Sequence, residues 1–153
     1  MEKRRVGKTQ LEIDVLGLGG APLGGNFADL NYAQGVEIVS GALDAGMSYF
    51  DTAPWYGFGR SERVVGDQLR GKNYILSSKV GRLLVPGAVT KPMDFGMIDP
   101  LPFHPVYDYS YDGVCVLLRM VCKGLVWTGL IFCWPMTLEP FSTVMTMRSI
   151  SKT

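Results

Sequence analysis

The chain has 153 residues, a formal net charge of +1 and 47% hydrophobic residues. This length allows one domain at most, and a net charge near zero gives no electrostatic reason to expect nucleic acid or an anionic membrane as a partner. The three cysteines form no Cys-x-x-Cys pair and are odd in number, so we expect no disulfide framework and a cytoplasmic location. The charged first 14 residues are followed by no apolar core, and a signal peptide is not predicted there.

The first third of the chain predicts a hairpin, a strand and a helix. Residues 1–14 contain two short extended runs around a Gly-Lys-Thr-Gln turn, which is typical of a hairpin. Residues 15–19 form an apolar run that ends in glycine and predict a strand before a glycine-rich loop. Apolar residues recur at spacings of three and four through residues 31–45, so we predict an amphipathic helix that Asn31 caps and Gly46 ends.

The next segment predicts two strands, one helix and a loop. Residues 47–51 and 73–80 read as strands, and residues 61–69 read as a helix with Ser61 as its N-cap. Residues 81–113 hold five of the nine prolines and predict a long loop. Strands and helices that alternate with short links imply an α/β fold with a parallel sheet and helices packed outside it.

Three polar side chains fall near the predicted carboxyl ends of neighbouring strands: Asp51, Tyr56 and Lys79. The carboxyl ends of parallel strands share one rim, where active sites form. An ammonium beside a tyrosine favours the phenolate and lowers the tyrosine pKa, so Tyr56 is a candidate general acid with Lys79 beside it and Asp51 holding the lysine. The spacing alone favours a structural interpretation, namely a turn-capping aspartate, a half-buried loop tyrosine and a solvated lysine.

The surrounding residues resemble the aldo-keto reductase family. The family pattern Gly-x-x-x-Phe-Asp-Thr-Ala-x-x-Tyr-Gly occurs at residues 46–57. Upstream, VLGLGGAPLGG is similar to the first barrel strand of the family. The hairpin predicted before it is similar to the plug at the bottom of the barrel. Downstream, ILSSKVGRL is similar to the third strand with its lysine. The resemblance extends over residues 4–113. It implies the N-terminal portion of a (β/α)8 TIM barrel, a hairpin plus about three β/α units, which is incomplete because a whole barrel takes roughly 250 residues.

The resemblance also implies an oxidoreductase that uses NAD(P). In this family hydride passes between the cofactor and the substrate carbon, so Tyr56 would move the proton on the substrate oxygen, with Asp51 and Lys79 tuning it. Gly20 and Asp51 are the implied cofactor-binding residues, and no metal is implied. Residues 17–25 do not fit the Rossmann fingerprint, and the family holds its dinucleotide mainly on the last barrel strands.

Three further motifs narrow the resemblance. DTAPWYGFGRSER, KVGRLL and YDYSYDGV are most similar to dehydrogenases that oxidise L-fucose, D-threo-aldoses or pyridoxal. They imply a small-molecule sugar hemiacetal or aldehyde as the substrate. The oligomeric state is not predicted.

The composition changes near Val114. Thirteen of the 14 acidic residues precede residue 115, and all three cysteines lie at or after it. The family pattern would continue with a helix and a fourth strand that ends in His-Asp. The only histidine of the chain, His104, lies in the predicted proline-rich loop, and we do not assign it the role of the family histidine.

A one-base change of reading frame accounts for this break. Residues 115–141 can be back-translated into codons and read in the frame that starts one base earlier. When that preceding base is A, this frame gives MRSFEDGLQRFGLDRIDILLAHDLGTL, which resembles the missing helix, strand and histidine. Synonymous codons were chosen to fit, but Trp127, Trp134 and the methionines allow no choice and fit as well. We therefore predict an N-terminal barrel part at residues 1–114 and an aberrant, out-of-frame apolar tail at residues 115–153.

Two alternatives to a working enzyme stay open for this chain. The first is a non-catalytic, unstable product, because open strand edges and an apolar tail favour aggregation. The second is a small membrane-associated protein, since residues 124–138 are very apolar. A membrane span takes about 20 apolar residues, and Pro135 interrupts this shorter run, so membrane association is the less favoured alternative.

Overall fold

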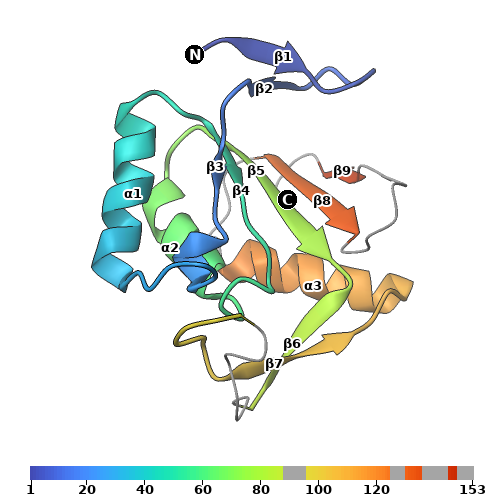
Figure 1. Cartoon of the computed structure of the whole chain (residues 1–153). Helices are drawn as coiled ribbons and strands as arrows, with labels where there is room; N and C mark the ends of the chain where they lie inside the picture. Colours follow the sequence, from blue (N-terminus) through green and yellow to red (C-terminus); the bar gives the residue numbers. More distant parts are fainter. Residues whose placement is uncertain (88–95, 125–129, 136–144, 148–153) are drawn as a thin grey trace.

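The computed structural model describes residues 1–87, 96–124, 130–135 and 145–147, with side chains as far as residue 120. Its main sheet has five strands in the order β3-β4-β5-β8-β9. The first four run parallel to their neighbours and β9 runs antiparallel to β8, which confirms the predicted parallel arrangement. The strands are β3 (Leu18–Gly19), β4 (Tyr49–Asp51), β5 (Ile75–Val80), β8 (Leu130–Pro135) and β9 (Met145–Met147) (Figure 1).

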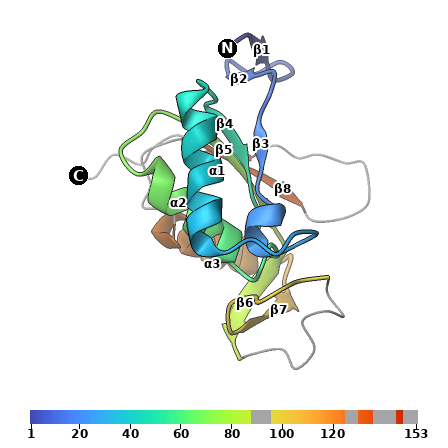
Figure 2. The same ribbon diagram turned by 60° about the vertical axis from the view of Figure 1, so that its left-hand side comes forward.

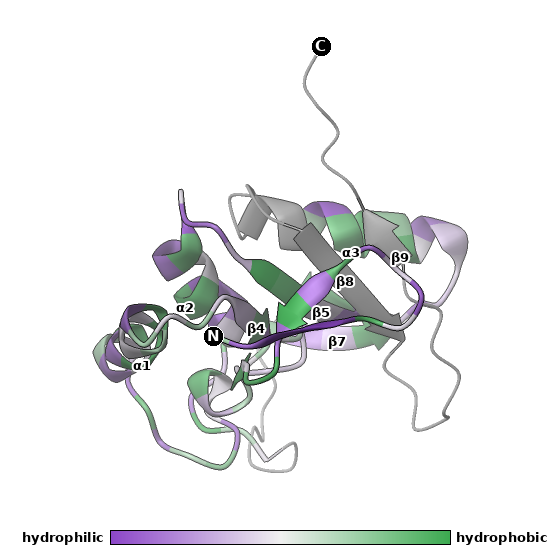
Figure 3. Cartoon of the chain, turned by 90° about the horizontal axis from the view of Figure 1, so that it is seen from above, coloured by the Kyte–Doolittle hydropathy of each residue, from purple (hydrophilic) through white to green (hydrophobic). Residues whose placement is uncertain are grey.

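The helices α1 (Tyr32–Asp44), α2 (Arg60–Leu69) and α3 (Tyr111–Gly124) pack along one face of this sheet (Figure 3). The core lies between the two layers and contains side chains that are at most 2% exposed, among them Val39, Phe50, Val64, Leu69, Leu76 and Leu117. Over the described residues the sheet stays open. The described part of the chain therefore forms a partial α/β arrangement without a closed barrel, as its sequence predicts.

The helix ends are fixed by local backbone chemistry. Asn31 caps α1 as predicted, because its side chain accepts a hydrogen bond from the Gln34 amide while the Gln34 side chain accepts one from the Asn31 amide. The prediction for α2 is wrong by two residues, since its N-cap is Gly59 with a φ of 94°. Ser61 lies inside the first turn of α2, where its hydroxyl donates to the Gly20 carbonyl oxygen at 2.7 Å. It therefore ties α2 to the loop after β3.

Two hairpins lie at opposite ends of the sheet (Figure 2). The predicted one consists of β1 (Lys3–Arg5) and β2 (Glu12–Asp14), which pair antiparallel. The second, β6 (Arg82–Pro86) with β7 (Phe103–Tyr107), corrects the loop predicted for this region. Prolines fit here because each strand of a two-stranded ribbon keeps one edge that needs no ladder hydrogen bond.

His104 lies within β7 and not in a loop. It pairs with Val85, and its Nδ1 atom is 3.3 Å from the Gly87 carbonyl oxygen. A 3-10 turn, η1 (Pro22–Gly24), follows β3.

The C-terminal segment adds one helix and two strands to the part predicted as a barrel. The helix α3 runs through the proposed boundary at Val114, and Leu117 and Leu118 of its tail half are buried in the core. With β8 and β9 the sheet has two strands more than the sequence predicts. No helix among the described residues is long and apolar enough to cross a membrane. Trp127 lies outside the described residues.

Candidate active site

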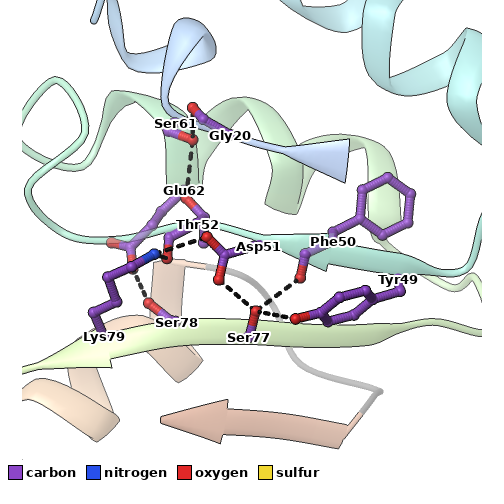
Figure 4. Close-up of polar contacts among 10 residues, drawn as sticks. All are labelled: Gly20, Tyr49, Phe50, Asp51, Thr52, Ser61, Glu62, Ser77, Ser78 and Lys79. Carbon is purple, nitrogen blue, oxygen red and sulfur yellow. Dashed lines mark hydrogen bonds and ion pairs between the residues drawn. The ribbon is translucent and has the colours of Figure 1, made fainter. Parts of the chain in front are cut away.

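The candidate site forms where β4 and β5 end side by side. The two strands pair with Asp51 opposite Ser77. Side chains alternate between the faces of a strand, so Lys79 points to the same face as Ser77, two residues earlier. The Lys79 Nζ atom donates to Asp51 Oδ1 at 2.7 Å and to the Thr52 carbonyl oxygen at 3.1 Å (Figure 4). The predicted contact between Asp51 and Lys79 is therefore present.

Ser77 is part of this site, although the sequence did not single it out. Its hydroxyl donates to Asp51 Oδ2 at 2.5 Å, and the Tyr49 hydroxyl lies 3.1 Å from the same Ser77 oxygen (Figure 4). Both carboxylate oxygens of Asp51 thus have a partner, which fixes the plane of the carboxylate. The signal in the sequence is the Ser-x-Lys spacing, which places both side chains on one face of a strand.

Tyr56 lies in the loop between β4 and α2, beside the lysine. The Lys79 Nζ atom is 4.7 Å from the centroid of the Tyr56 ring, a contact in the range of cation–π attraction. The loop around Tyr56 is tightly packed, since a Cβ atom on Gly24 would clash with the Tyr56 carbonyl carbon. The structure therefore brings the three predicted residues together.

The electrostatics of the site favour a charged lysine. Burial alone lowers the pKa of Lys79, but hydrogen bonding to Asp51 and Tyr56 outweighs it, and the net effect raises the Lys79 pKa above its ordinary value. The ammonium is thus retained beside the tyrosine at neutral pH. A fixed cation next to a phenol stabilises negative charge on the phenol oxygen, which suits the phenol to proton transfer.

Gly20 closes the site on the side of β3. Its amide donates to the Asp51 carbonyl oxygen at 2.7 Å, and an added Cβ atom would lie 2.5 Å from the Ser61 hydroxyl oxygen and 2.9 Å from the Asp51 carbonyl oxygen. This contact explains why the position takes glycine, because a larger residue would push the loop away from Asp51. A role for Gly20 in cofactor binding stays a prediction.

Glu62 is a second residue that the sequence did not single out. It lies in α2, is 9% exposed, and accepts a hydrogen bond from the Ser78 hydroxyl at 3.0 Å (Figure 4). Ser78 and Lys79 are neighbours and point to opposite faces of β5, so Glu62 approaches the strand from the helix side. Burial raises the pKa of Glu62 to about 7, against smaller lowering effects from Ser78 and Lys79.

The comparison with known proteins points to one family. Over 124 aligned residues the chain is 44% identical to a pyridoxal 4-dehydrogenase of Microbacterium luteolum, covering 74% of this chain and 36% of that protein. It is 35% identical over 113 residues to a D-threo-aldose 1-dehydrogenase of Pseudomonas sp, covering 68% of this chain and 34% of that protein. The chain thus spans about a third of the length of these relatives.

The fold agrees with this comparison. The aldo-keto reductase AKR11C1 of Bacillus halodurans superposes with a TM-score of 0.61 at 25% identity, covering 82% of this chain and 37% of that one. The model of the Aldo/keto reductase family matches residues 15–100, a range that contains Asp51, Tyr56 and Lys79. The chain belongs to the aldo/keto reductase family.

Proposed function

We propose that Asp51, Tyr56 and Lys79 form the proton-transfer centre of an NAD(P)-dependent oxidoreductase that acts on a small aldehyde or sugar hemiacetal. The observation that carries this proposal is the position of the Lys79 ammonium, 2.7 Å from Asp51 and 4.7 Å from the Tyr56 ring centroid. The names of the relatives, a pyridoxal dehydrogenase and an aldose dehydrogenase, support this substrate class. A cytoplasmic location, expected from the cysteines, belongs to the same proposal.

The side chains have separate tasks in this proposal. Tyr56 gives a proton to the substrate oxygen during reduction and takes it back during oxidation. Lys79 stabilises the negative charge that the Tyr56 oxygen carries between these steps. Asp51 and the Thr52 carbonyl oxygen hold the Lys79 ammonium in place. NAD(P), when bound, supplies or accepts the hydride at the substrate carbon.

The residues of the site fit the reactive end of such a cofactor. The donor set combines a phenol, an ammonium and a carboxylate at the carboxyl ends of parallel strands, where barrel enzymes hold their ligands. Gly20 and Asp51, the implied cofactor-binding residues, contact one another at this edge through the hydrogen bond of the Gly20 amide. We propose that they lie against the nicotinamide portion.

We further propose that the chain as printed turns over little or no substrate. After Val114 the sequence no longer follows the family pattern, and other residues stand where the resemblance implies the family histidine. The adjacent reading frame supplies the family-like helix, strand and histidine that residues 115–141 lack. This supports an inactive, out-of-frame product of an oxidoreductase gene.

Two proteins test these proposals: the printed chain, and the product of the same gene with one base inserted between the codons of Val114 and Cys115. NADP is titrated against each while tryptophan fluorescence is followed, with Trp55→Phe identifying the signal from the site. We expect saturable binding and pyridoxal or aldose oxidation for the second protein alone, and loss of oxidation with retained NADP binding in its Tyr56→Phe variant. Saturable NADP binding by the printed chain would contradict the inactive-product proposal, and full activity of Tyr56→Phe would contradict the assigned role of Tyr56.

A further inference from the structure

Arg82 occupies an unusual position at the edge of the candidate site. It is the first residue of β6, three residues after Lys79, at the base of the hairpin that extends from the carboxyl end of β5 (Figure 1). Its guanidinium carbon lies 4.0 Å from the ring centroid of Trp55 and 5.0 Å from that of Tyr107. Because Trp55 precedes Tyr56 in the chain, this stack connects the hairpin to the loop that carries the candidate acid.

The Arg82 guanidinium has no carboxylate partner in the part of the chain that the structure describes. None of the ion pairs among the described residues includes Arg82, whereas Lys79 is paired with Asp51. The Arg82 Nε atom is also buried and has no hydrogen-bond acceptor within the described part of the chain. A buried donor without an acceptor costs free energy, so an arginine in this state is suited to an acceptor that a ligand brings.

The stack determines which kind of ligand fits. Two aromatic rings against a guanidinium leave its edge as the direction for hydrogen bonds. That edge matches the paired oxygens of a carboxylate or the single oxygen of a phenolate, and hydrogen bonds of this charge-assisted kind are about twice as strong as neutral ones. A neutral hydroxyl would not balance the charge.

We infer that Arg82 is a substrate-recognition residue, which binds an anionic oxygen, carboxylate or phenolate, on the carbonyl substrate. Trp55 and Tyr107 hold the guanidinium plane in the required orientation. The inference rests on the proposed function for the position of the reacting carbon, beside Tyr56. It adds a substrate class, since it selects aldehydes that carry a negatively charged group.

The test uses the full chain, labelled with 15N, and follows the Nε–Hε signal of Arg82 by NMR. The probe is 4-formylbenzoate, and benzaldehyde is its neutral counterpart. We expect a saturable shift of the Arg82 signal with 4-formylbenzoate and none with benzaldehyde. In Arg82→Lys the affinity for 4-formylbenzoate should fall at least about tenfold, because lysine lacks the forked donors and the planar group that stacks on the aromatic rings. Arg70→Lys is the matched control, since Arg70 is exposed and pairs with Asp67, and its affinity should not change.

Four outcomes would overturn the inference. One is an equal shift with benzaldehyde, which would assign the site to an aromatic ring. Another is unchanged affinity in Arg82→Lys. The third is displacement of the probe by inorganic phosphate, with a larger Arg82 shift from NADP than from the probe, which would assign Arg82 to the cofactor. The fourth is no shift with 4-formylbenzoate.

Tyr107→Leu provides a second variant if Arg82→Lys does not fold. Tyr107 is 62% exposed, so its removal frees one face of the guanidinium with little loss of core packing, and weaker probe binding is expected. Unchanged probe binding in this variant would count against the proposed role of the stack. The titration needs neither NAD(P) nor turnover. If the protein with the inserted base failed to bind NADP while the probe still bound Arg82, the proposed function would be contradicted and Arg82 would remain as the anion site.

Discussion

The buried carboxyl of Glu62 gives a stability prediction that depends on pH. The group is 9% exposed, hydrogen-bonds only Ser78 among the described residues, and has a pKa raised from 4.5 to about 7. An acid whose pKa is higher in the folded state keeps its proton more tightly when folded. The folded state is therefore favoured most at low pH, and this contribution is lost as the pH rises from about 4.5 to about 7.

The size of the effect follows from the two pKa values of Glu62. The difference between 4.5 and about 7 corresponds to roughly 3 kcal/mol at about 1.4 kcal/mol per pKa unit. This is an upper value, because Glu62 also lines a cavity of about 280 Å3 that can admit water to the carboxylate. We expect a measured change in the free energy of unfolding of about 1 to 3 kcal/mol.

Glu62→Gln isolates this effect, because glutamine stays neutral and its amide oxygen can still accept from Ser78. Urea unfolding followed by circular dichroism from about pH 5 to about pH 8 should show a falling stability for the native chain and a smaller fall for the variant. Their difference should grow with pH and level off above about 7. Glu37→Gln, an exposed change in α1, is the control. Parallel curves for the native chain and Glu62→Gln would refute the reasoning.

Two further predictions concern the loop and the ion pair of the site. Gly24→Ala should destabilise the fold by about 1 to 3 kcal/mol, because its Cβ atom would clash with the Tyr56 backbone. Gly41→Ala, with nothing within 4 Å of the added Cβ atom, should instead stabilise α1 by about 1 kcal/mol. Thermal unfolding compares the two variants, and equal effects would contradict the clash. Asp51→Asn should lower the pKa of Lys79, since it removes a raising contact; a 13C NMR titration of the lysine side chain measures this, and an unchanged titration would contradict the assigned pairing.

The first 80 residues follow from their sequence because their signals are local. The Asn31 cap and the apolar spacing after it predict α1, and the structure confirms both. The start of α2 was mispredicted because Gly59 caps the helix with a left-handed backbone, which carries no side-chain signal. The sequence does not predict the β6–β7 hairpin, because its five pairs, two of which contain a proline, join segments about 20 residues apart. No local pattern specifies that contact.

The site was predictable in its named residues and less so in its supports. Asp51 and Lys79 were found because a family motif carries them, and the structure places them in contact. Ser77 and Glu62 lie within the same motifs, but the motifs alone do not mark them as parts of the site. Their importance depends on which face of β5 meets which neighbour, through Asp51 on one side and Ser78 on the other. These contacts are determined by the register of the sheet and the packing of α2 against β5, which the sequence does not specify locally.

In the C-terminal segment, forming a helix and a strand requires much less of the sequence than supplying a catalytic side chain. The start of α3 is fixed by residues within the family resemblance, because the Ser110 hydroxyl accepts from the Gly113 amide and the Asp108 carboxylate accepts from the Ser110 amide. Beyond Val114 the helix needs only apolar residues at suitable spacing, which Leu117 and Leu118 supply.

Strand β8 then pairs with β5 through main-chain groups, which every residue except proline provides in full. A changed reading frame can thus preserve a helix and a strand in these places. It cannot preserve a side chain: the proposed adjacent frame would have histidine at the position after Pro135, where this chain has Met136, which lies outside the described residues. A thioether neither donates nor transfers a proton as an imidazole does. We therefore expect a change of frame to alter the chemistry at this rim more than the arrangement of the chain.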